Sequence, residues 1–396
     1  MGHLSAALIH GYLQRALEWL QAYTGEMPLH RFLKHKFRQH PQLGARDRHF
    51  ITALLYDYFR LGHSFPGRTA AEKMLIGFLV CEKDPAPLIQ VLLPAWMEAC
   101  SRPEPIDRAS WFPDFRVEEI FPWQWLLSAS LDARAFALSY LQQPEVFVRI
   151  RPGHERVFTT LDLPMRKLEE NILAFPAGLD LKHHLPAMEG IDYVVQDYAS
   201  QQVMAYLVKY LQQLQPGKCW NIWDCCAGSG GKSIYLYDYL SIGRLVVTDI
   251  RASILTNLSK RFQLAGLKKY TAVPVDVRRE TELKRIMGRM RFQLILADVP
   301  CTGSGTWART PEQLHFFLPE QLTDFQQSQL AILRQATKYL EPGGYLAYIT
   351  CSVFKPENED VVAALQADGL QLIDSRLIAG YASGGDALYV ALLKAR

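Results

Sequence analysis

Two cysteines stand where a thiol could act as a nucleophile. Cys301 follows the apolar run 292–298, and Cys351 follows the apolar run 344–350. If both runs are neighbouring strands of one sheet, both thiols lie at the same rim. A thiolate there can form a covalent intermediate that divides one difficult step into easier ones, provided that the site lowers its pKa. Three other cysteines are expected to be small buried hydrophobes, namely Cys81, Cys100 and Cys219.

Asp298 stands three residues before Cys301 on the same predicted loop. A carboxylic acid that stays protonated near neutral pH can donate a hydrogen bond to a ring nitrogen. Asp298 is therefore a candidate for stabilising the adduct of a thiolate with an electron-poor ring.

A glycine-rich turn, DCCAGSGGKS (224–233), follows another apolar run and leads into a predicted helix. Such turns present free backbone N–H groups to a ligand. The turn fails the P-loop pattern because Cys226 replaces its first glycine. It also fails the dinucleotide pattern, which has a glycine where this chain has Ser233. We therefore expect a ligand-binding turn of neither type.

Four predicted strands in succession end in aspartates. Open α/β sheets bind ligands at the carboxyl ends of their strands, and a carboxylate after the second strand can accept hydrogen bonds from ribose hydroxyls. Single aspartates at such ends are common as helix caps. Four in step predict a polar nucleoside pocket, and S-adenosylmethionine (SAM) fits its carboxylates. The aspartates are Asp224, Asp249, Asp276 and Asp298.

The elements that position these residues alternate between strand and helix from about residue 201. This alternation predicts an α/β fold, with a parallel sheet covered by helices on both faces. The expected strands are 220–224, 244–249, 271–275, 292–298, 344–350 and 387–394.

The preceding chain divides into two further predicted segments. Apolar residues spaced three and four apart predict helices over 1–125. The segment 126–200 contains an alternating strand at 146–151, a helix-like stretch at 159–175 and a short strand at 193–196. We therefore predict domains at 1–125, 126–200 and 201–396.

Composition and charge are those of an ordinary globular chain of 396 residues with a net charge of +3. Basic residues nevertheless outnumber acidic ones in 31–48 and in 251–291. Each run could bind a polyanion, or it could simply be a solvent-exposed protein surface; the two interpretations are equally compatible with the sequence.

The seven cysteines are not spaced as zinc ligands are, so we expect reduced thiols and no metal. The first residues lack the pattern of a signal peptide, and no apolar run is long enough to span a membrane, so we expect a cytoplasmic protein.

Motifs across most of the chain resemble the RNA (cytosine-5) methyltransferases of the Fmu/Sun group. D-x-C-A-x-x-G-G-K occurs at 224–232, D-x-P-C at 298–301 and T-C-S at 350–352, with Glu357-Asn358 following. Arg309, Pro311 and the segment 196–201 match further family positions. One departure is Gly228-Ser229, where the family usually has Ala-Pro. The first segment resembles the NusB-like RNA-binding domain of the bacterial ribosomal-RNA members, and the second resembles the family's small RNA-binding extension.

The resemblance implies a Rossmann-like SAM-dependent methyltransferase domain that forms 5-methylcytosine. It implies Cys351 as the nucleophile toward carbon 6 of cytosine and Cys301 as an aid to product release. Asp298 and Lys232 would also touch the cytosine. The SAM site would comprise Cys226, Ala227, Gly228, Ser229, Gly230, Gly231, Lys232, Asp249, Asp276 and Asp298. Ribosomal RNA of the 16S type is the expected substrate, and we expect a monomer.

Four other functions are also compatible with the sequence. A transfer-RNA methyltransferase would use the same chemistry, whereas a DNA cytosine-5 methyltransferase would make Cys301 the nucleophile. A non-catalytic ribosome-assembly factor would keep the fold without turnover. A nucleotide hydrolase would use the turn at Gly231-Lys232-Ser233, which the missing first glycine disfavours.

Overall fold

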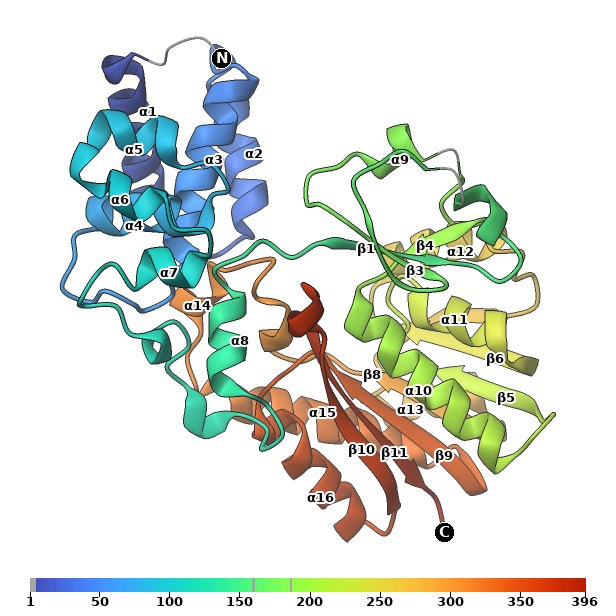
Figure 1. The fold of residues 1–396 in the computed structure, drawn as a ribbon. Helices are drawn as coiled ribbons and strands as arrows, with labels where there is room; N and C mark the ends of the chain where they lie inside the picture. The colour runs from blue at the N-terminus through green and yellow to red at the C-terminus, as the bar shows by residue number, and fades with distance from the viewer. Residues whose placement is uncertain (1–4, 159–160, 186) are drawn as a thin grey trace. The chain divides into compact units, whose positions relative to one another are not determined.

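The computed structural model describes residues 5–158, 161–185 and 187–396, and the chain divides into two compact units (Figure 1). The first unit comprises Met1–Trp125, Asp132–Gln143 and Thr306–Leu318. The second comprises Leu126–Leu131, Pro144–Gly305 and Pro319–Arg396. No helix in the described ranges is long and apolar enough to cross a membrane.

The first unit is built from helices, as predicted for residues 1–125. Helix α4 shows why one of them begins where it does: Thr69 and Glu72 form a capping box, in which each side chain accepts a hydrogen bond from the other residue's backbone N–H. The helices are α1 (Ala6–Ala22), α2 (Leu29–Gln39), α3 (Ala45–Arg60), α4 (Ala70–Cys81), α5 (Ala86–Leu92), α6 (Met97–Cys100), α7 (Pro105–Ala109), α8 (Ala133–Ser139) and α14 (Gln313–Phe316).

A segment from far along the chain, 306–318, completes the core of the first unit. Trp307 is buried there, with its ring 5.0 Å from that of Phe317 and 6.3 Å from that of Trp123. The buried guanidinium of Arg60 donates to the Ala308 carbonyl at 2.9 Å. The carboxylate of Glu312 accepts from the backbone N–H of Leu29 at 3.0 Å. The contacts with Arg60 and Leu29 tie the segment to helices α3 and α2, which precede it by more than 200 residues.

A four-stranded antiparallel sheet, in the order β2-β3-β1-β4, opens the second unit. Its strands are β1 (Val146–Ile150), β2 (Arg166–Glu169), β3 (Ile172–Phe175) and β4 (Tyr193–Val195), with the short helix α9 (Leu181–His184) between the last two. The helix expected over 159–175 is therefore wrong for 161–175, and 159–160 lie outside the described residues. All four residues of β3 are buried between two neighbouring strands, a setting that a one-sided helix pattern does not anticipate.

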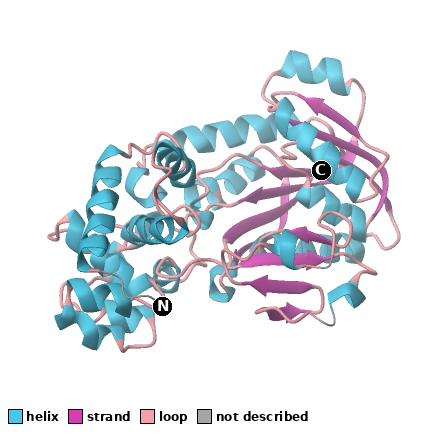
Figure 2. Cartoon of the chain, turned by 90° about the horizontal axis from the view of Figure 1, so that it is seen from above, coloured by secondary structure: helices cyan, strands magenta, loops and turns pink. Residues whose placement is uncertain are grey.

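A seven-stranded sheet, in the order β10-β11-β9-β8-β5-β6-β7, forms the core of the second unit (Figure 2). The neighbours from β9 to β7 run parallel, whereas β11 lies antiparallel to both β9 and β10. The strands are β5 (Cys219–Asp224), β6 (Ser241–Asp249), β7 (Thr271–Pro274), β8 (Phe292–Asp298), β9 (Leu340–Thr350), β10 (Gln371–Ala379) and β11 (Ala387–Lys394).

Helices cover both faces of this sheet, and alternate strand residues enter two separate cores. Trp220 and Ile222 of β5 pack in one core with α10 (Tyr198–Leu214), α11 (Gly231–Tyr239) and α12 (Ala252–Leu264). Trp223 of the same strand packs in the other with α13 (Glu280–Met287), α15 (Gln321–Thr337) and α16 (Glu359–Ala367). The predicted α/β fold class is confirmed. The predicted parallel sheet is interrupted by β11, which runs antiparallel to both of its neighbours, and β10 was not among the predicted strands.

The remaining helical turns are of the 3-10 type. They are η1 (Pro94–Trp96), η2 (Val117–Glu119), η3 (Gln124–Leu126), η4 (Glu155–Phe158), η5 (Ser304–Thr306), η6 (Lys355–Glu357) and η7 (Gly380–Ser383).

Candidate active site

The register of β8 and β9 brings the two candidate cysteines together. These parallel neighbours pair Asp298 with Ile349, so the loops that follow them leave the sheet side by side. The sulfur atoms of Cys301 and Cys351 lie 3.2 Å apart, within hydrogen-bonding distance for thiols. The rim position expected from the sequence is therefore what the structure shows.

A buried glutamate fixes the two cysteine loops to each other. The carboxylate of Glu357 accepts from the backbone N–H and hydroxyl of Thr302, at 2.9 and 2.6 Å, on the Cys301 loop. It also accepts from the hydroxyl of Ser352 at 2.5 Å, beside Cys351, and from the amide of Gln329 at 3.0 Å. Burial raises the pKa of Glu357, and the hydrogen bonds from Ser352 and Thr302 oppose that shift. Four donors on one buried carboxylate hold the spacing of the two thiols.

Further contacts of backbone and side-chain atoms fix the loop that carries Cys351. The N–H of Gly305 donates to the carbonyl of Cys351 at 2.9 Å. A Cβ at Gly305 would lie 2.0 Å from the carbonyl oxygen of Ala387, so only glycine permits this approach. The side chain of Asn358 accepts from Thr350 at 2.6 Å and donates to the carbonyl of Ser352 at 2.9 Å. The loop that carries Cys351 is thus fixed on both sides of the cysteine.

Lys232 and Asp298 form an ion pair at this rim. The ammonium Nζ lies 2.6 Å from Oδ2 of Asp298. Burial tends to lower the pKa of Lys232, but the negative charges of Asp298, Cys351 and Asp224 outweigh it and raise the pKa above its ordinary value. Lys232 therefore stays a cation that faces the thiol region. Hydrogen-bond donation by a protonated Asp298 remains a prediction, since here this carboxyl accepts from lysine.

The thiol of Cys301 is held in its protonated form. Its hydrogen bond with Cys351, together with burial and the charges of Cys351 and Glu357, raises the pKa of Cys301 well above the ordinary value. Two thiols this close cannot both ionise readily.

The glycine-rich turn between β5 and α11 adopts the shape expected of a ligand loop. Gly228 and Gly230 have φ values of +53° and +81°, which favour glycine. A Cβ at Gly230 would lie 2.5 Å from the ring of Phe262, whereas one at Gly228 would meet nothing within 4 Å. Space is therefore open at Gly228 but not at Gly230. Arg261 holds the turn by donating to the Ser229 hydroxyl at 2.6 Å.

Two further strand-end aspartates, Asp249 at the end of β6 and Asp276 just after β7, belong to neighbouring strands, and Asp249 contacts the turn. Oδ2 of Asp249 accepts from the N–H of Gly228 at 3.0 Å, while its other oxygen accepts from the N–H of Arg251 at 2.9 Å. Asp276 accepts from the N–H and the guanidinium of Arg278, which lowers the pKa of Asp276 despite partial burial. Both aspartates are thus pre-oriented by an arginine two residues later.

Asp224 is the most deeply buried of the four aspartates. Ser233 donates to its Oδ2 at 2.7 Å, and Oδ1 has no hydrogen-bond partner among the described residues. Burial raises the pKa of Asp224 to about 7; the hydrogen bond from Ser233 opposes the shift and the charge of Asp298 adds to it.

Several residues that build the site were not found from the sequence. The repeated spacing Asp-x-Arg at 249–251 and 276–278 was a signal for Arg251 and Arg278. Gln329 gave no local signal, because it reaches Glu357 from the middle of α15. Among the described residues, no group of three or more His, Cys, Asp or Glu side chains could hold a metal ion.

Comparison with known proteins finds similarity to methyltransferases. Residues 211–380 match the family model described as 16S rRNA methyltransferase RsmB/F. The chain is 27% identical over 274 residues to ribosomal RNA small subunit methyltransferase B of Klebsiella pneumoniae (strain 342), covering 64% of this chain and 56% of that protein. It is 25% identical over 361 residues to the protein of that name from Enterobacter sp. (strain 638), covering 85% and 78%. The chain thus spans just over half the length of the first of these relatives.

Solved structures agree with the fold. The crystal structure of PH0851 matches with a TM-score of 0.65 at 18% identity and covers 98% of this chain and 99% of its own. A methyltransferase homologue from Pyrococcus horikoshii matches with a TM-score of 0.53 at 18% identity, covering 68% of this chain and 92% of its own.

Proposed function

We propose that the protein methylates carbon 5 of a cytosine in RNA, using SAM, since residues 211–380 match the family model described as 16S rRNA methyltransferase RsmB/F. Small-subunit ribosomal RNA is the proposed substrate, since the relatives named above are ribosomal RNA methyltransferases. The observation that carries the chemistry is the pair of thiols 3.2 Å apart beside the Lys232–Asp298 ion pair.

Cys351 is the proposed nucleophile. Cys301 keeps its proton, and its sulfur lies within hydrogen-bonding distance of the sulfur of Cys351. The Lys232 ammonium adds a positive charge to the same region. The Cys351 thiolate adds to carbon 6 of the cytosine, which breaks the aromaticity of the ring and makes carbon 5 nucleophilic.

Cys301 has the second role. Once carbon 5 carries the methyl group, a base must take the proton that remains on carbon 5, and the electron pair of that C–H bond then re-forms the ring double bond and expels the Cys351 thiolate from carbon 6. Cys301 lies close enough to Cys351 to assist this release. Lys232 and Asp298 would contact the polar edge of the cytosine and hold the ring over Cys351.

The residues of the turn and the strand ends fit SAM. Space is open at Gly228, whose N–H is held 3.0 Å from the Asp249 carboxylate, a suitable partner for ribose hydroxyls. Asp276 follows the neighbouring strand β7 and would face the adenine side of the cofactor. Residues 226–232 would contact the rest of the SAM molecule through their backbone. When bound, SAM supplies an electrophilic methyl group on a positively charged sulfur.

The segments 1–125 and 126–200 would supply RNA contacts as separate domains beside the methyltransferase domain at 201–396. We propose a cytoplasmic monomer that uses no metal.

The test is incubation of the protein with tritiated-methyl SAM and separate pools of ribosomal RNA, transfer RNA and DNA, followed by nucleoside analysis. Label in 5-methylcytidine from ribosomal RNA is the expected result. Cys351→Ala should abolish it, whereas Cys219→Ala should not, because the Cys219 thiol lies at the start of β5 and is exposed, rather than buried as expected from the sequence. Label from transfer RNA would correct the substrate, and label only in DNA would move the nucleophile to Cys301. No label, with SAM still bound, would favour an assembly factor.

A further inference from the structure

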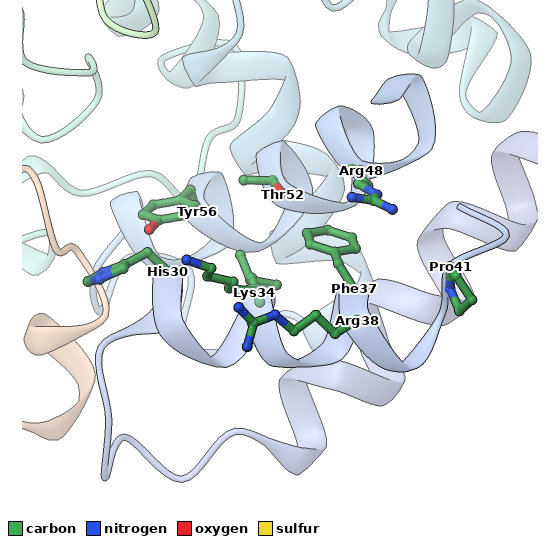
Figure 3. Close-up of a pocket in the computed structure, with 9 residues that line it drawn as sticks. His30, Lys34, Phe37, Arg38, Pro41, Arg48, Thr52 and Tyr56 are labelled. Carbon is green, nitrogen blue, oxygen red and sulfur yellow. The ribbon is translucent and has the colours of Figure 1, made fainter. Parts of the chain in front are cut away.

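A hollow of about 540 Å³ lies in the first unit, between one face of α2 and one face of α3 (Figure 3). The residues from α2 and the loop after it recur at helical spacing, and so do those from α3, so each set lies on a single helix face. The volume is that of a small-molecule or nucleotide site. The lining residues are His30, Leu33, Lys34, Phe37, Arg38, Pro41, Arg48, Thr52 and Tyr56.

The hollow is positively charged and no acidic residue lines it. Lys34 and Arg38 are exposed on successive turns of α2, and neither has an ion-pair or hydrogen-bond partner among the described residues. Arg48 is partly engaged, since its Nε donates to the carbonyl of Leu43 at 2.8 Å. Two free cations side by side repel each other unless an anion lies between them.

Aromatic rings share the hollow with these cations. The Arg48 guanidinium lies 5.6 Å from the centre of the Phe37 ring, and Tyr56 faces the hollow from α3. Figure 3 shows Tyr56 and Thr52 across from Lys34 and Arg38. A site for inorganic anions has no need of rings, whereas single-stranded nucleic acid presents phosphates beside unstacked bases that pack on aromatic and guanidinium planes.

We propose that this α2–α3 hollow binds a nucleotide of single-stranded RNA. Lys34 and Arg38 contact the phosphates on either side of the nucleotide, and its base packs against Tyr56 and the Phe37–Arg48 pair. The inference rests on the proposed RNA substrate and places one contact of that RNA in the helical unit, apart from the cysteines.

The experiment measures binding of the full-length protein to a fluorescein-labelled 12-nucleotide single-stranded RNA by anisotropy, over a series of salt concentrations. Lys34→Ala/Arg38→Ala should lower the slope of log affinity against log salt by about 1.4, since each phosphate contact on a single strand contributes about 0.7. The control Arg31→Ala/Lys36→Ala removes the same charge from the same helix without touching the hollow, and should keep the parental slope.

A second pair of variants tests the base contact. Tyr56→Leu should weaken binding roughly tenfold, as loss of one base–aromatic stack does, without changing the salt slope. Tyr56→Phe, which keeps the ring, should bind like the parent. An equal slope change in both double variants, or parental affinity in Tyr56→Leu, would overturn the inference.

The same preparations separate this inference from the proposed function. Suppose that the Lys34, Arg38 and Tyr56 variants change RNA binding as expected but the parent never transfers label from tritiated SAM to RNA. The methylation proposal is then wrong, and the inference of RNA binding in the hollow is supported. If the parent methylates RNA while these variants keep its affinity and salt slope, only the inference of RNA binding in the hollow is wrong.

Discussion

At the scale of single residues, the titration of Asp224 makes the stability of the folded protein depend on pH. Its pKa rises to about 7 in the folded protein because the carboxyl is buried, whereas an unfolded aspartate titrates near 4. The folded state therefore binds this proton more tightly, and the parent loses stability as pH rises from about 4 to 7, by up to about 4 kcal/mol. Asp224→Asn cannot ionise, so its melting temperature relative to the parent should climb across this window.

Asp276→Asn is the matched control for that titration, because Arg278 lowers the pKa of Asp276. The pH dependence has the opposite sign. The parent gains stability from this carboxylate as pH rises through about 4, so the melting temperature of the variant should fall below that of the parent. Thermal unfolding between pH 3 and 8 measures both. A constant difference between Asp224→Asn and the parent at every pH would refute the assignment.

Glu357→Gln should loosen the cysteine loops. The amide cannot replace a carboxylate that accepts from Thr302, Ser352 and Gln329, so at least one buried donor loses its acceptor. We expect a loss of about 1–3 kcal/mol of stability and slower methylation with unchanged SAM affinity. Glu359→Gln alters a nearby side chain that accepts from Ser128, and should cost less on both measures. Equal effects of the two variants would contradict a special role for Glu357.

Residue types predicted much of the site, because each cysteine and aspartate directly follows a recognisable apolar strand. The sequence could not predict what those side chains touch. Glu357 was seen only as part of a motif, and its four donors come from three separate segments. Burial of Asp224 likewise depends on the packing of α11 over the strand ends, which no local pattern reports.

At the scale of elements, the turn between β5 and α11 depends on contact with α12. Gly230→Ala would force a Cβ into Phe262 and Leu258 at a positive φ. We expect a loss of about 2–4 kcal/mol from strain and overpacking, together with weaker SAM binding. Gly231→Ala, at the next position, meets only the ends of Arg261 at 3.9 Å and should be nearly neutral. Calorimetric titration with SAM and thermal unfolding would compare the two, and equal melting temperatures would refute the contact.

Elements were predictable where burial on both faces gives an uninterrupted apolar run. The strands β5, β6, β8 and β11 were expected at nearly their observed bounds for this reason. β10 was missed because its strand has mixed exposure at the edge of the sheet. The β2–β3 hairpin was mistaken for a helix because its two-residue turn, Glu170-Asn171, lacks the glycine that usually marks such turns.

At the scale of the whole molecule, the helical unit takes part of its core from the segment that follows the Cys301 loop. Trp307→Ala should remove buried contacts with Trp123 and Phe317 and cost about 3–5 kcal/mol. Trp125→Ala is the control, since Trp125 is 73% exposed. Thermal unfolding of the full chain should show a large loss for the first variant and almost none for the second; similar losses would contradict the packing.

The alternation of strand and helix was sufficient to predict the α/β class of the second unit. The discontinuous course of the chain was not predictable, because joining 306–318 to helices near the N-terminus depends on tertiary contacts such as that of Arg60 with Ala308. The domain bounds at 125 and 200 remain predictions.

The central claim is that Cys351 attacks the cytosine and Cys301 releases it. The most direct measurement is denaturing electrophoresis of Cys301→Ala after incubation with labelled ribosomal RNA and SAM. We predict a complex of protein and RNA that survives denaturant and disappears in Cys301→Ala/Cys351→Ala. A complex that persists in the double variant, or that forms with Cys351→Ala alone, would contradict the assignment of the nucleophile.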